Sequence, residues 1–321
     1  MHCDTISRIR ELREQGETCE LRENELQVDL KRMKDAGYLM QTFALFIDKK
    51  STRDPFQNCM ELLDCFYVEM EKYSDWIRPV TKASQILENE REGRMSALLG
   101  IEEGGACLGK LEFLRNFYRL GVRLMTLTWN YENEIGFPNR VMEHMPFGNP
   151  ETEYGIKEKG IAFLEEMERL GMLIDVSHLG DKAFYDVCRY TKGPLIASHS
   201  NARTICPHVR NMTDDMIRIL AERGGVMGIN FAALFTEYSR EKGELGTIDG
   251  LIRHMQYIVN LAGIEAVGLG TDFDGIERII EMDDCSMMPI LAQRMKQAGF
   301  SEEDVEKICY KNMLRLLQEV L

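Results

Sequence analysis

Short apolar runs that end on a histidine or an aspartate recur along this chain, and they constrain its fold more than any other feature. One run ends at His178, a second at His199 and a third at Asp272. Each run has the length and composition of a buried β-strand. A (β/α)8 barrel collects polar groups from the ends of separate strands at its C-terminal face and builds its active site there. The pattern therefore predicts such a barrel, with metal-assisted chemistry at that face.

The apolar runs alternate with helical patterns over the whole chain, as one barrel requires. A (β/α)8 barrel takes about 250 residues and more with insertions, so we expect a single domain over residues 1–321. An eighth strand should precede seven others, yet only Met1 stands before His2, so we expect a truncated first strand. A helix that begins at Asn24 and ends at Gly37 is expected to follow. The seven other strands are expected to begin near residues 38, 95, 122, 172, 194, 226 and 267.

Net charge and cysteine content limit the partners and the compartment. The formal net charge of −14 would repel phosphates, so we expect no nucleic acid and no membrane as partner. The nine cysteines are dispersed and form no Cys-x-x-Cys pair, which favours a reducing compartment over a disulfide framework. No stretch resembles a signal peptide or approaches the roughly 18 apolar residues of a spanning helix. We therefore expect a cytoplasmic protein.

Histidines are scarce, which makes their placement informative. Only six occur, and three of them, His2, His178 and His199, fall at strand ends in the order that a barrel site requires. His144 lies in a loop and His254 on a helix face, and we expect neither to be a ligand. Imidazole together with carboxylate suits zinc, although iron or manganese would accept the same ligands.

Carboxylates complete the candidate metal site. Asp4 follows His2 in a His-x-Asp pair, and Glu102 and Glu103 follow a strand and precede two glycines. A carboxylate at that strand end can bridge two cations where the glycines give the backbone room. Asp272 ends the last strand, whereas Asp274 is expected only to cap the next helix.

One arginine can reach the barrel mouth. Arg210 follows His199 in a loop that also holds Arg203 and Asn211. A guanidinium binds a carboxylate through two parallel hydrogen bonds, so Arg210 is a candidate for binding an anionic substrate group.

Seven motifs together resemble one known family over nearly the whole chain. The chain carries them at His2-Cys-Asp4-Thr5, Gly100-Ile-Glu102, residues 114–128, Ile174-Asp-Val-Ser-His178, Ser198-His-Ser-Asn-Ala-Arg203, Arg210-Asn211 and Gly270-Thr-Asp-Phe-Asp-Gly275. On these residues the chain resembles the membrane (renal) dipeptidase family of zinc metallopeptidases, and its bacterial cytoplasmic branch in particular. The resemblance implies a (β/α)8 barrel with two Zn²⁺ per chain, and other divalent metals would suit the same ligands.

The resemblance also implies a role for each candidate residue. Glu102 is preferred to Glu103 as the bridge because only Glu102 stays in ungapped register with residues 114–121. Asp272 would be the acid/base carboxylate, and Arg210, with Asn211 beside it, would bind the C-terminal carboxylate of the substrate. The ligands would be His2 and Asp4 on one metal ion, His178 and His199 on the other, and Glu102 between the two.

One residue departs from the family pattern. Mammalian members have a substrate-contacting histidine where this chain has Trp129. An indole donates one hydrogen bond but cannot become an imidazolium. We therefore expect the stabilisation of the carbonyl oxygen, and with it the substrate range, to differ.

The residues and the resemblance together predict a binuclear metal-dependent dipeptidase that hydrolyses dipeptides with a free C-terminal carboxylate. The resemblance implies that C-terminal D-residues are accepted as well. A first alternative is another amidohydrolase-type barrel that acts on lactones, cyclic amides or N-acyl amino acids. Such enzymes often bridge their metals with a carboxylated lysine, and the glutamate here disfavours them. A second alternative is a non-catalytic metal-binding barrel, which the loss of a ligand would signal, but all five ligands are present. A homodimer is expected only by analogy with the family.

Overall fold

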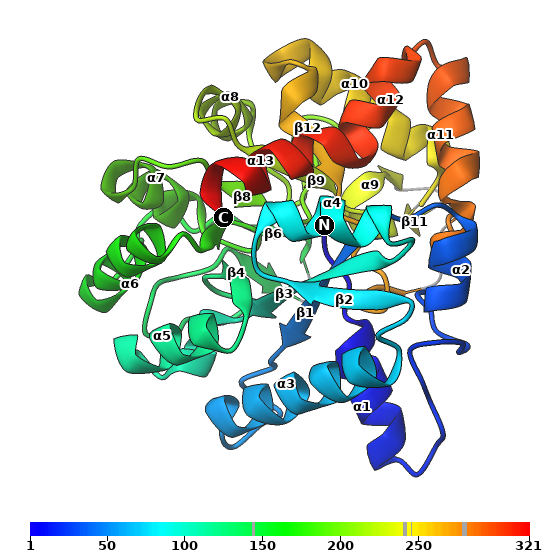
Figure 1. The fold of residues 1–321 in the computed structure, drawn as a ribbon. Coiled ribbons are helices and arrows are strands. Elements are labelled where there is room, and N and C mark those ends of the chain that lie inside the picture. Colours follow the sequence, from blue (N-terminus) through cyan, green and yellow to red (C-terminus); the bar gives the residue numbers. More distant parts are fainter. Residues whose placement is uncertain (143–144, 240–242, 245, 278–280) are drawn as a thin grey trace.

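Seven parallel strands form the wall of a barrel in the computed structural model (Figure 1). Each strand pairs with the next in chain order, at the positions that the sequence predicted. The structure describes residues 1–142, 145–239, 243–244, 246–277 and 281–321. The strands of the wall are β1 (Met40–Phe46), β3 (Met95–Glu102), β4 (Val122–Thr126), β7 (Leu173–Asp175), β8 (Ile196–Ala197), β9 (Val226–Ile229) and β12 (Val267–Leu269).

The first four residues close the barrel between β12 and β1. The amide of Asp4 donates to the carbonyl of Phe273 at 2.9 Å, and the amide of Ala44 donates to the carbonyl of Cys3 at 2.9 Å. Cys3 and Phe273 also form a parallel bridge. Residues 1–4 therefore take the place of the first strand, which is as short as predicted, and the expected (β/α)8 barrel is confirmed.

Helices surround this wall on the outside (Figure 1). None of the helices in the described ranges is long and apolar enough to cross a bilayer. The helix expected from Asn24 begins only at Leu30, because the carboxylate of Asp29 accepts from the amide of Arg32 and caps it there. The α-helices are α1 (Thr5–Glu14), α2 (Leu30–Asp35), α3 (Pro55–Lys72), α4 (Ala83–Arg91), α5 (Leu111–Arg119), α6 (Glu158–Leu170), α7 (Asp181–Tyr190), α8 (Asp214–Glu222), α9 (Ala233–Thr236), α10 (Ile248–Ala262), α11 (Met288–Gln297), α12 (Glu302–Glu306) and α13 (Asn312–Val320). Shorter turns are η1 (Gly104–Cys107), η2 (Ile264–Ala266), η3 (Cys285–Met287) and the π-helical η4 (Lys307–Lys311).

Two helices cover the N-terminal end of the barrel. α13 and α4 lie across the front of the strands in Figure 1. An extra strand, β2 (Ile77–Val80), pairs with the first half of β3 and leads into α4. One apolar cluster joins the strands to these helices, and it contains Leu98, Leu124, Leu173, Ile196 and Val226 from the wall, Ile86 from α4, and Leu316 and Leu317 from α13.

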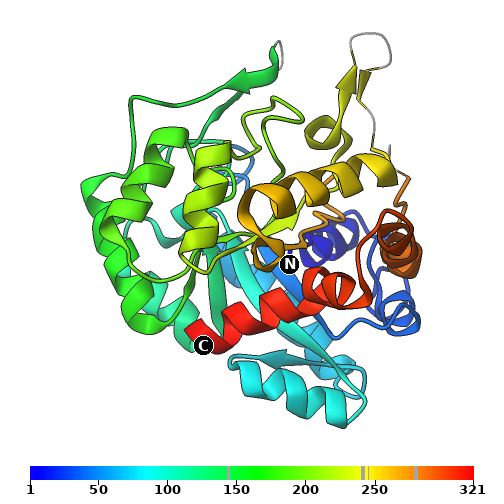
Figure 2. The same cartoon turned by 90° about the horizontal axis from the view of Figure 1, so that it is seen from above.

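The loops that follow the strands gather at the opposite end. Two antiparallel hairpins, β5 (Arg140–Met142) with β6 (Met145–Asn149) and β10 (Tyr238–Ser239) with β11 (Gly243–Glu244), belong to these loops. Figure 2 shows both hairpins projecting from the same side of the molecule. The predicted non-ligand His144 lies outside the described residues. This end of the barrel is where the predicted site should form.

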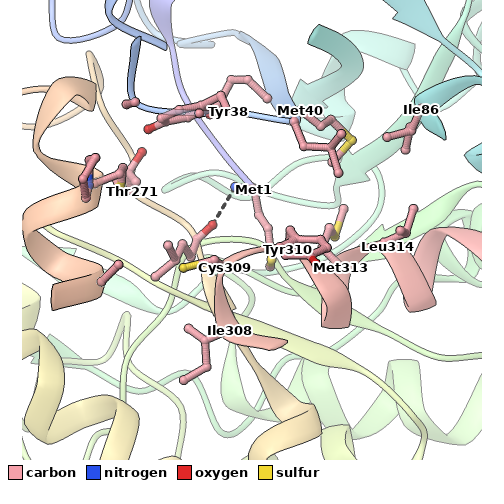
Figure 3. Close-up of a pocket in the computed structure, with 18 of the residues that line it drawn as sticks. Met1, Tyr38, Met40, Ile86, Thr271, Ile308, Cys309, Tyr310, Met313 and Leu314 are labelled. Atoms are coloured by element: carbon pink, nitrogen blue, oxygen red, sulfur yellow. Dashed lines mark hydrogen bonds between the residues drawn. The ribbon is translucent and has the colours of Figure 1, made fainter. Parts of the chain in front are cut away.

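An apolar cavity of about 300 Å³ lies beside Met1, away from that end (Figure 3). The α-amine of Met1 donates to the carbonyl of Leu269 at 2.6 Å. Tyr38 and Met40 border the cavity on one side and Met313 on another. No histidine or carboxylate is among its described lining residues, so it is distinct from the predicted metal site.

Candidate metal centre and active site

All five predicted metal ligands meet at the C-terminal end of the barrel. They come from the shortened first strand, from the end of β3, and from the residues that follow β7 and β8. Every one of them is buried. The structure thus brings together His2, Asp4, Glu102, His178 and His199.

The carboxylate of Glu102 lies between His2 on one side and the pair His178 and His199 on the other. Its Oε1 is 3.0 Å from Nε2 of His178 and 3.4 Å from Nε2 of His199. Its Oε2 is 3.3 Å from Nε2 of His2. Because the two oxygens face different histidines, this carboxylate can serve two cations at once.

Buried polar atoms without hydrogen bonds mark the same place. Nε2 of His2 and Oδ1 of Asp4 have no hydrogen-bond partner among the described residues. Nε2 of His178 lies 2.9 Å from Nε2 of His199. Two imidazole lone pairs at that separation repel each other unless a proton or a cation lies between them. Imidazoles with carboxylates fit zinc and similar divalent ions.

Asp272, the predicted acid/base group, lies beside His2 and Asp4. Its Oδ1 lies 3.9 Å from Nε2 of His2. Its Oδ2 accepts a hydrogen bond from Nδ2 of Asn230 at 2.8 Å. His2, Asp4 and Asp272 offer ligand atoms within 4.8 Å of one another, so Asp272 is also close enough to bind a cation.

Several residues of the site have a left-handed backbone conformation. His178, Asp272 and Asp274 have φ values of 67°, 61° and 68°, in a region that side-chain-bearing residues rarely adopt. Such strain persists only where the surrounding structure enforces it, and it is typical of functional sites. Gly275 is required nearby, since a Cβ there would lie 2.1 Å from Oδ2 of Asp4.

Burial and mutual charge shift the protonation of the cluster. Burial, reinforced by the Glu102 carboxylate, raises the pKa of Asp4 to about 7. Burial also lowers the pKa of His178 to about 4, and the charge of Arg210 adds to that shift. Although burial acts to raise it, the pKa of Glu102 is held well below its usual range by the neighbouring imidazoles. A cation would favour the ionised carboxylates and neutral imidazoles that ligation needs.

A cavity of about 600 Å³ opens onto this cluster. Glu102, His178 and Asp272 line it together with Trp129 and Phe46. The two aromatic rings meet edge to face, with centroids 4.9 Å apart, and the Trp129 ring lies 6.1 Å from the ring of His178. The volume is in the range of small-molecule sites. Trp129 lies on the wall of this cavity, and its predicted substrate contact stays a prediction.

Arg210 approaches the cluster through a smaller neighbouring cavity. The residue is 4% exposed, and His178 lines both cavities. Nη2 of Arg210 donates to the carbonyl of His199 at 3.3 Å, while its Nε has no hydrogen-bond partner in the described part of the chain. Burial lowers the pKa of Arg210 to about 10, so it stays a cation at neutral pH.

The side chain of Asn211 forms hydrogen bonds that fix the loop carrying Arg210. Its Nδ2 donates to the carbonyls of Cys206 and Phe235, at 2.9 and 2.8 Å. Its Oδ1 accepts from the amide of Asn201 at 3.1 Å. The predicted substrate contact by Asn211 stays a prediction, and these partners favour a role in positioning Arg210.

Comparison with known proteins identifies the family. The sequence model of the membrane dipeptidase family, peptidase family M19, matches residues 1–321. The chain belongs to this family. Among its relatives, dipeptidase tcpJ of Claviceps purpurea is 33% identical over 279 residues, which cover 87% of this chain and 62% of the fungal protein. The chain thus spans less than two thirds of that relative.

Two solved structures share the fold over almost their entire length. A metallo peptidase from Rhodobacter sphaeroides, liganded with a phosphinate mimic of the dipeptide L-Ala-D-Ala, is 26% identical with a TM-score of 0.89, covering 100% of this chain and 98% of that one. Dipeptidase AC, a metallo peptidase of family M19, is 26% identical with a TM-score of 0.88, covering 99% and 97%.

These matches confirm the predicted resemblance, the barrel and the class of hydrolase. Membership in a metallopeptidase family implies divalent metal binding, and the buried cluster supplies suitable ligands. The number and identity of the ions do not follow from membership alone.

A second layer of polar groups behind the ligands was not found from the sequence. Oδ1 of Asn130 lies 2.9 Å from Nδ1 of His178, and Oγ of Ser198 lies 2.7 Å from Nδ1 of His199. Asp175 in turn binds Ser198. A carboxylate inside an otherwise apolar strand is costly to bury without partners, and this signal could have drawn attention to Asp175.

Glu103 and Asp274 hold loops. Oε1 of Glu103 accepts from Nδ2 of Asn133, and its Oε2 accepts from the amide of Trp129 at 2.8 Å. The preference for Glu102 as the residue facing the histidines thus agrees with the geometry. Asp274 accepts hydrogen bonds from the hydroxyl of Thr5 and from the amide of Gln27, each at 2.6 Å, and its predicted role as a helix cap stays a prediction.

Proposed function

We propose that this chain is a metal-dependent dipeptidase that holds two divalent ions, with zinc preferred. The observation that carries the proposal is that the two oxygens of the buried Glu102 face different histidines, Oε1 facing His178 and His199 and Oε2 facing His2. His2 and Asp4 would hold one ion, and His178 and His199 the other. Two ions bound there would activate a water molecule and polarise the scissile carbonyl.

Asp272 would handle the proton of the reaction. Its Oδ1 faces the cluster, while Asn230 holds Oδ2. Burial raises the pKa of Asp272, which strengthens it as a base. In this role Asp272 takes a proton from the attacking water and returns it to the leaving amine.

Arg210 would select substrates by their length. It is a buried cation, and the described part of the chain provides it with no salt bridge. A substrate carboxylate would supply the missing partner at a fixed distance from the cluster. That distance limits the substrates to dipeptides with a free C-terminus.

The bound ligand of the Rhodobacter relative supports this substrate class. That ligand mimics a dipeptide whose C-terminal residue is D-alanine. We propose that this chain also accepts C-terminal D-residues, and that Trp129, on the cavity wall, changes which side chains it prefers.

The remaining proposals concern the domain organisation, the cellular location and the oligomeric state of the enzyme. Residues 1–321 would act as one catalytic domain, because every proposed site residue comes from the same barrel. No disulfide joins the nine cysteines, all of which lie in the described ranges, which supports a cytoplasmic location. The proposed site needs no second copy of the chain, so a homodimer stays a prediction by analogy.

The proposal is tested by assaying the zinc-loaded protein on a substrate panel. The panel contains L-Ala-L-Ala, L-Ala-D-Ala, their C-terminal amides, an N-acyl amino acid and a lactone. We expect hydrolysis of the two free dipeptides and no hydrolysis in the His199→Ala control. Turnover of the lactone or the N-acyl amino acid with inert dipeptides would overturn the proposal.

A further inference from the structure

One hydroxyl lies behind both sets of predicted metal ligands. Oγ of Ser198 is 2.7 Å from Nδ1 of His199 and 3.3 Å from Nδ1 of His2. The same oxygen is 2.6 Å from Oδ2 of Asp175. These four residues are fully buried, and we refer to them as the Ser198 network.

The direction of each hydrogen bond in the Ser198 network follows from Asp175. Oδ1 of Asp175 accepts from the amides of Ser177 and Ser198, at 3.0 and 2.9 Å. Oδ2 accepts from the hydroxyls of Thr126 and Ser198, each at 2.6 Å. A carboxylate only accepts, so the single hydroxyl proton of Ser198 points to Asp175.

The remaining lone pairs of Ser198 can then only accept hydrogen bonds. Nδ1 of His199 and Nδ1 of His2 must therefore each carry a proton. In a neutral imidazole this leaves Nε2 with its lone pair exposed. Nε2 of both residues faces the carboxylate of Glu102, where the cations are proposed to bind.

We infer that Asp175, acting through Ser198, sets the tautomers of His199 and His2 and so directs one nitrogen lone pair of each at the metal centre. Asp175 and Ser198 are positioning residues, since neither faces the cavity that opens onto the cluster. The link to metal binding rests on the proposed function, whereas the tautomers themselves do not. His178 lies outside the Ser198 network. In the metal-free protein its Nε2 carries the proton that separates it from Nε2 of His199, at 2.9 Å, and from Oε1 of Glu102, at 3.0 Å, while the amide of Asn130 can turn to donate to its Nδ1.

Asp175→Asn reverses the network while keeping its shape. The amide oxygen of the new side chain must stay where Oδ1 was, because two backbone amides donate to it. Its NH₂ group then replaces Oδ2 and donates to the hydroxyls of Ser198 and Thr126. The proton of Ser198 has to turn elsewhere, and the nearest acceptor is Nδ1 of His199. His199 would then carry its proton on Nε2, the nitrogen that ligation needs to be free.

Two measurements test the inference. ¹H–¹⁵N NMR of the metal-free protein, with the His199 signals assigned by their loss in His199→Gln, reports which ring nitrogen carries the proton. We expect Nδ1 in the wild type and Nε2 in Asp175→Asn. Competition with a chelator then measures zinc affinity, which should fall by about 10- to 100-fold in Asp175→Asn, as for other residues that orient metal ligands.

Two further variants separate this role from general destabilisation. Thr126→Val removes the other hydroxyl bound to Oδ2 of Asp175 and should leave both readouts unchanged. Ser198→Ala removes the acceptor itself, so His199 should lose its preference for Nδ1 and zinc should bind more weakly. Ser198→Ala also provides the test if Asp175→Asn does not fold.

The inference is overturned if His199 keeps its proton on Nδ1 in Asp175→Asn and in Ser198→Ala, or if both variants bind zinc as tightly as the wild type. A failure of the proposed function would look different. In that case the wild type itself would bind no zinc or leave dipeptides intact, while the tautomers of the metal-free protein would still report on the Ser198 network.

Discussion

Replacing Arg210 with methionine should weaken recognition of the substrate carboxylate without removing the metal ligands. Arg210 is 4% exposed, its Nε has no hydrogen-bond partner among the described residues, and one bond of 3.3 Å joins it to the carbonyl of His199. A bound dipeptide would give this cation its partner. Methionine keeps much of the side-chain volume and removes the charge, so the change isolates the ion pair.

The expected magnitude follows from the burial of Arg210. Truncating one partner of a buried, hydrogen-bonded charge pair costs about 2–5 kcal/mol. At about 1.36 kcal/mol per tenfold change, kcat/KM for a free dipeptide should fall by roughly 30- to 5,000-fold. The matching C-terminal amide cannot form the pair, so its slow turnover should change little.

The assay compares steady-state kinetics on matched free-acid and amide dipeptides. The wild type should strongly prefer the free acid, and Arg210→Met should lose most of that preference. Arg203→Met is the matched control, because Arg203 lies in the same loop but is already paired with Asp181 at 2.6 Å. Equal turnover of acid and amide by the wild type, or an unchanged preference in Arg210→Met, would refute the reasoning.

Further predictions concern the metal, the acid/base group and the pH dependence of folding. Asp272→Asn should keep its metal and lose about 10²-fold or more in kcat, and elemental analysis showing metal loss would instead make Asp272 a ligand. His199→Ala should lose metal and activity together, measured in the same way. Burial lowers the pKa of His254 from 6.5 to about 4. Between these two pH values the imidazole of His254 is protonated in the unfolded chain and neutral in the folded protein. Stability should therefore decline by about 3 kcal/mol as the pH falls through that interval, and His254→Gln should remove this decline in denaturant unfolding; an unchanged pH dependence would contradict it.

The barrel could be predicted because its strands carry a strong local signal. Their apolar runs are buried on both faces, as all eight residues of β3 are, so composition alone locates them. α1 (Thr5–Glu14) was not expected, because only Ile6 and Ile9 provide its buried apolar face. The helix expected from Asn24 failed for another reason: the side chain of Asn24 makes local bonds to the carbonyls of Glu20 and Val28 and holds a loop.

The meeting of the candidate ligands could be predicted because these residues lie at or just beyond strand ends, and strand ends in a closed barrel converge. The groups behind them could not, because their role depends on contacts between distant residues. Asp175 and Thr126 lie on adjacent strands, and Ser198 reaches His2 across 196 positions of sequence. Periodicity and composition carry no information on which of these side chains meet.

The central claim is that Glu102 bridges two ions, and a zinc titration tests it most directly. Protein stripped with a chelator is reloaded stepwise, and bound zinc and dipeptide hydrolysis are measured at each step. The arrangement of the ligands predicts saturation at about two zinc ions per chain, with full activity only at the second. Saturation and full activity with a single ion would contradict the claim.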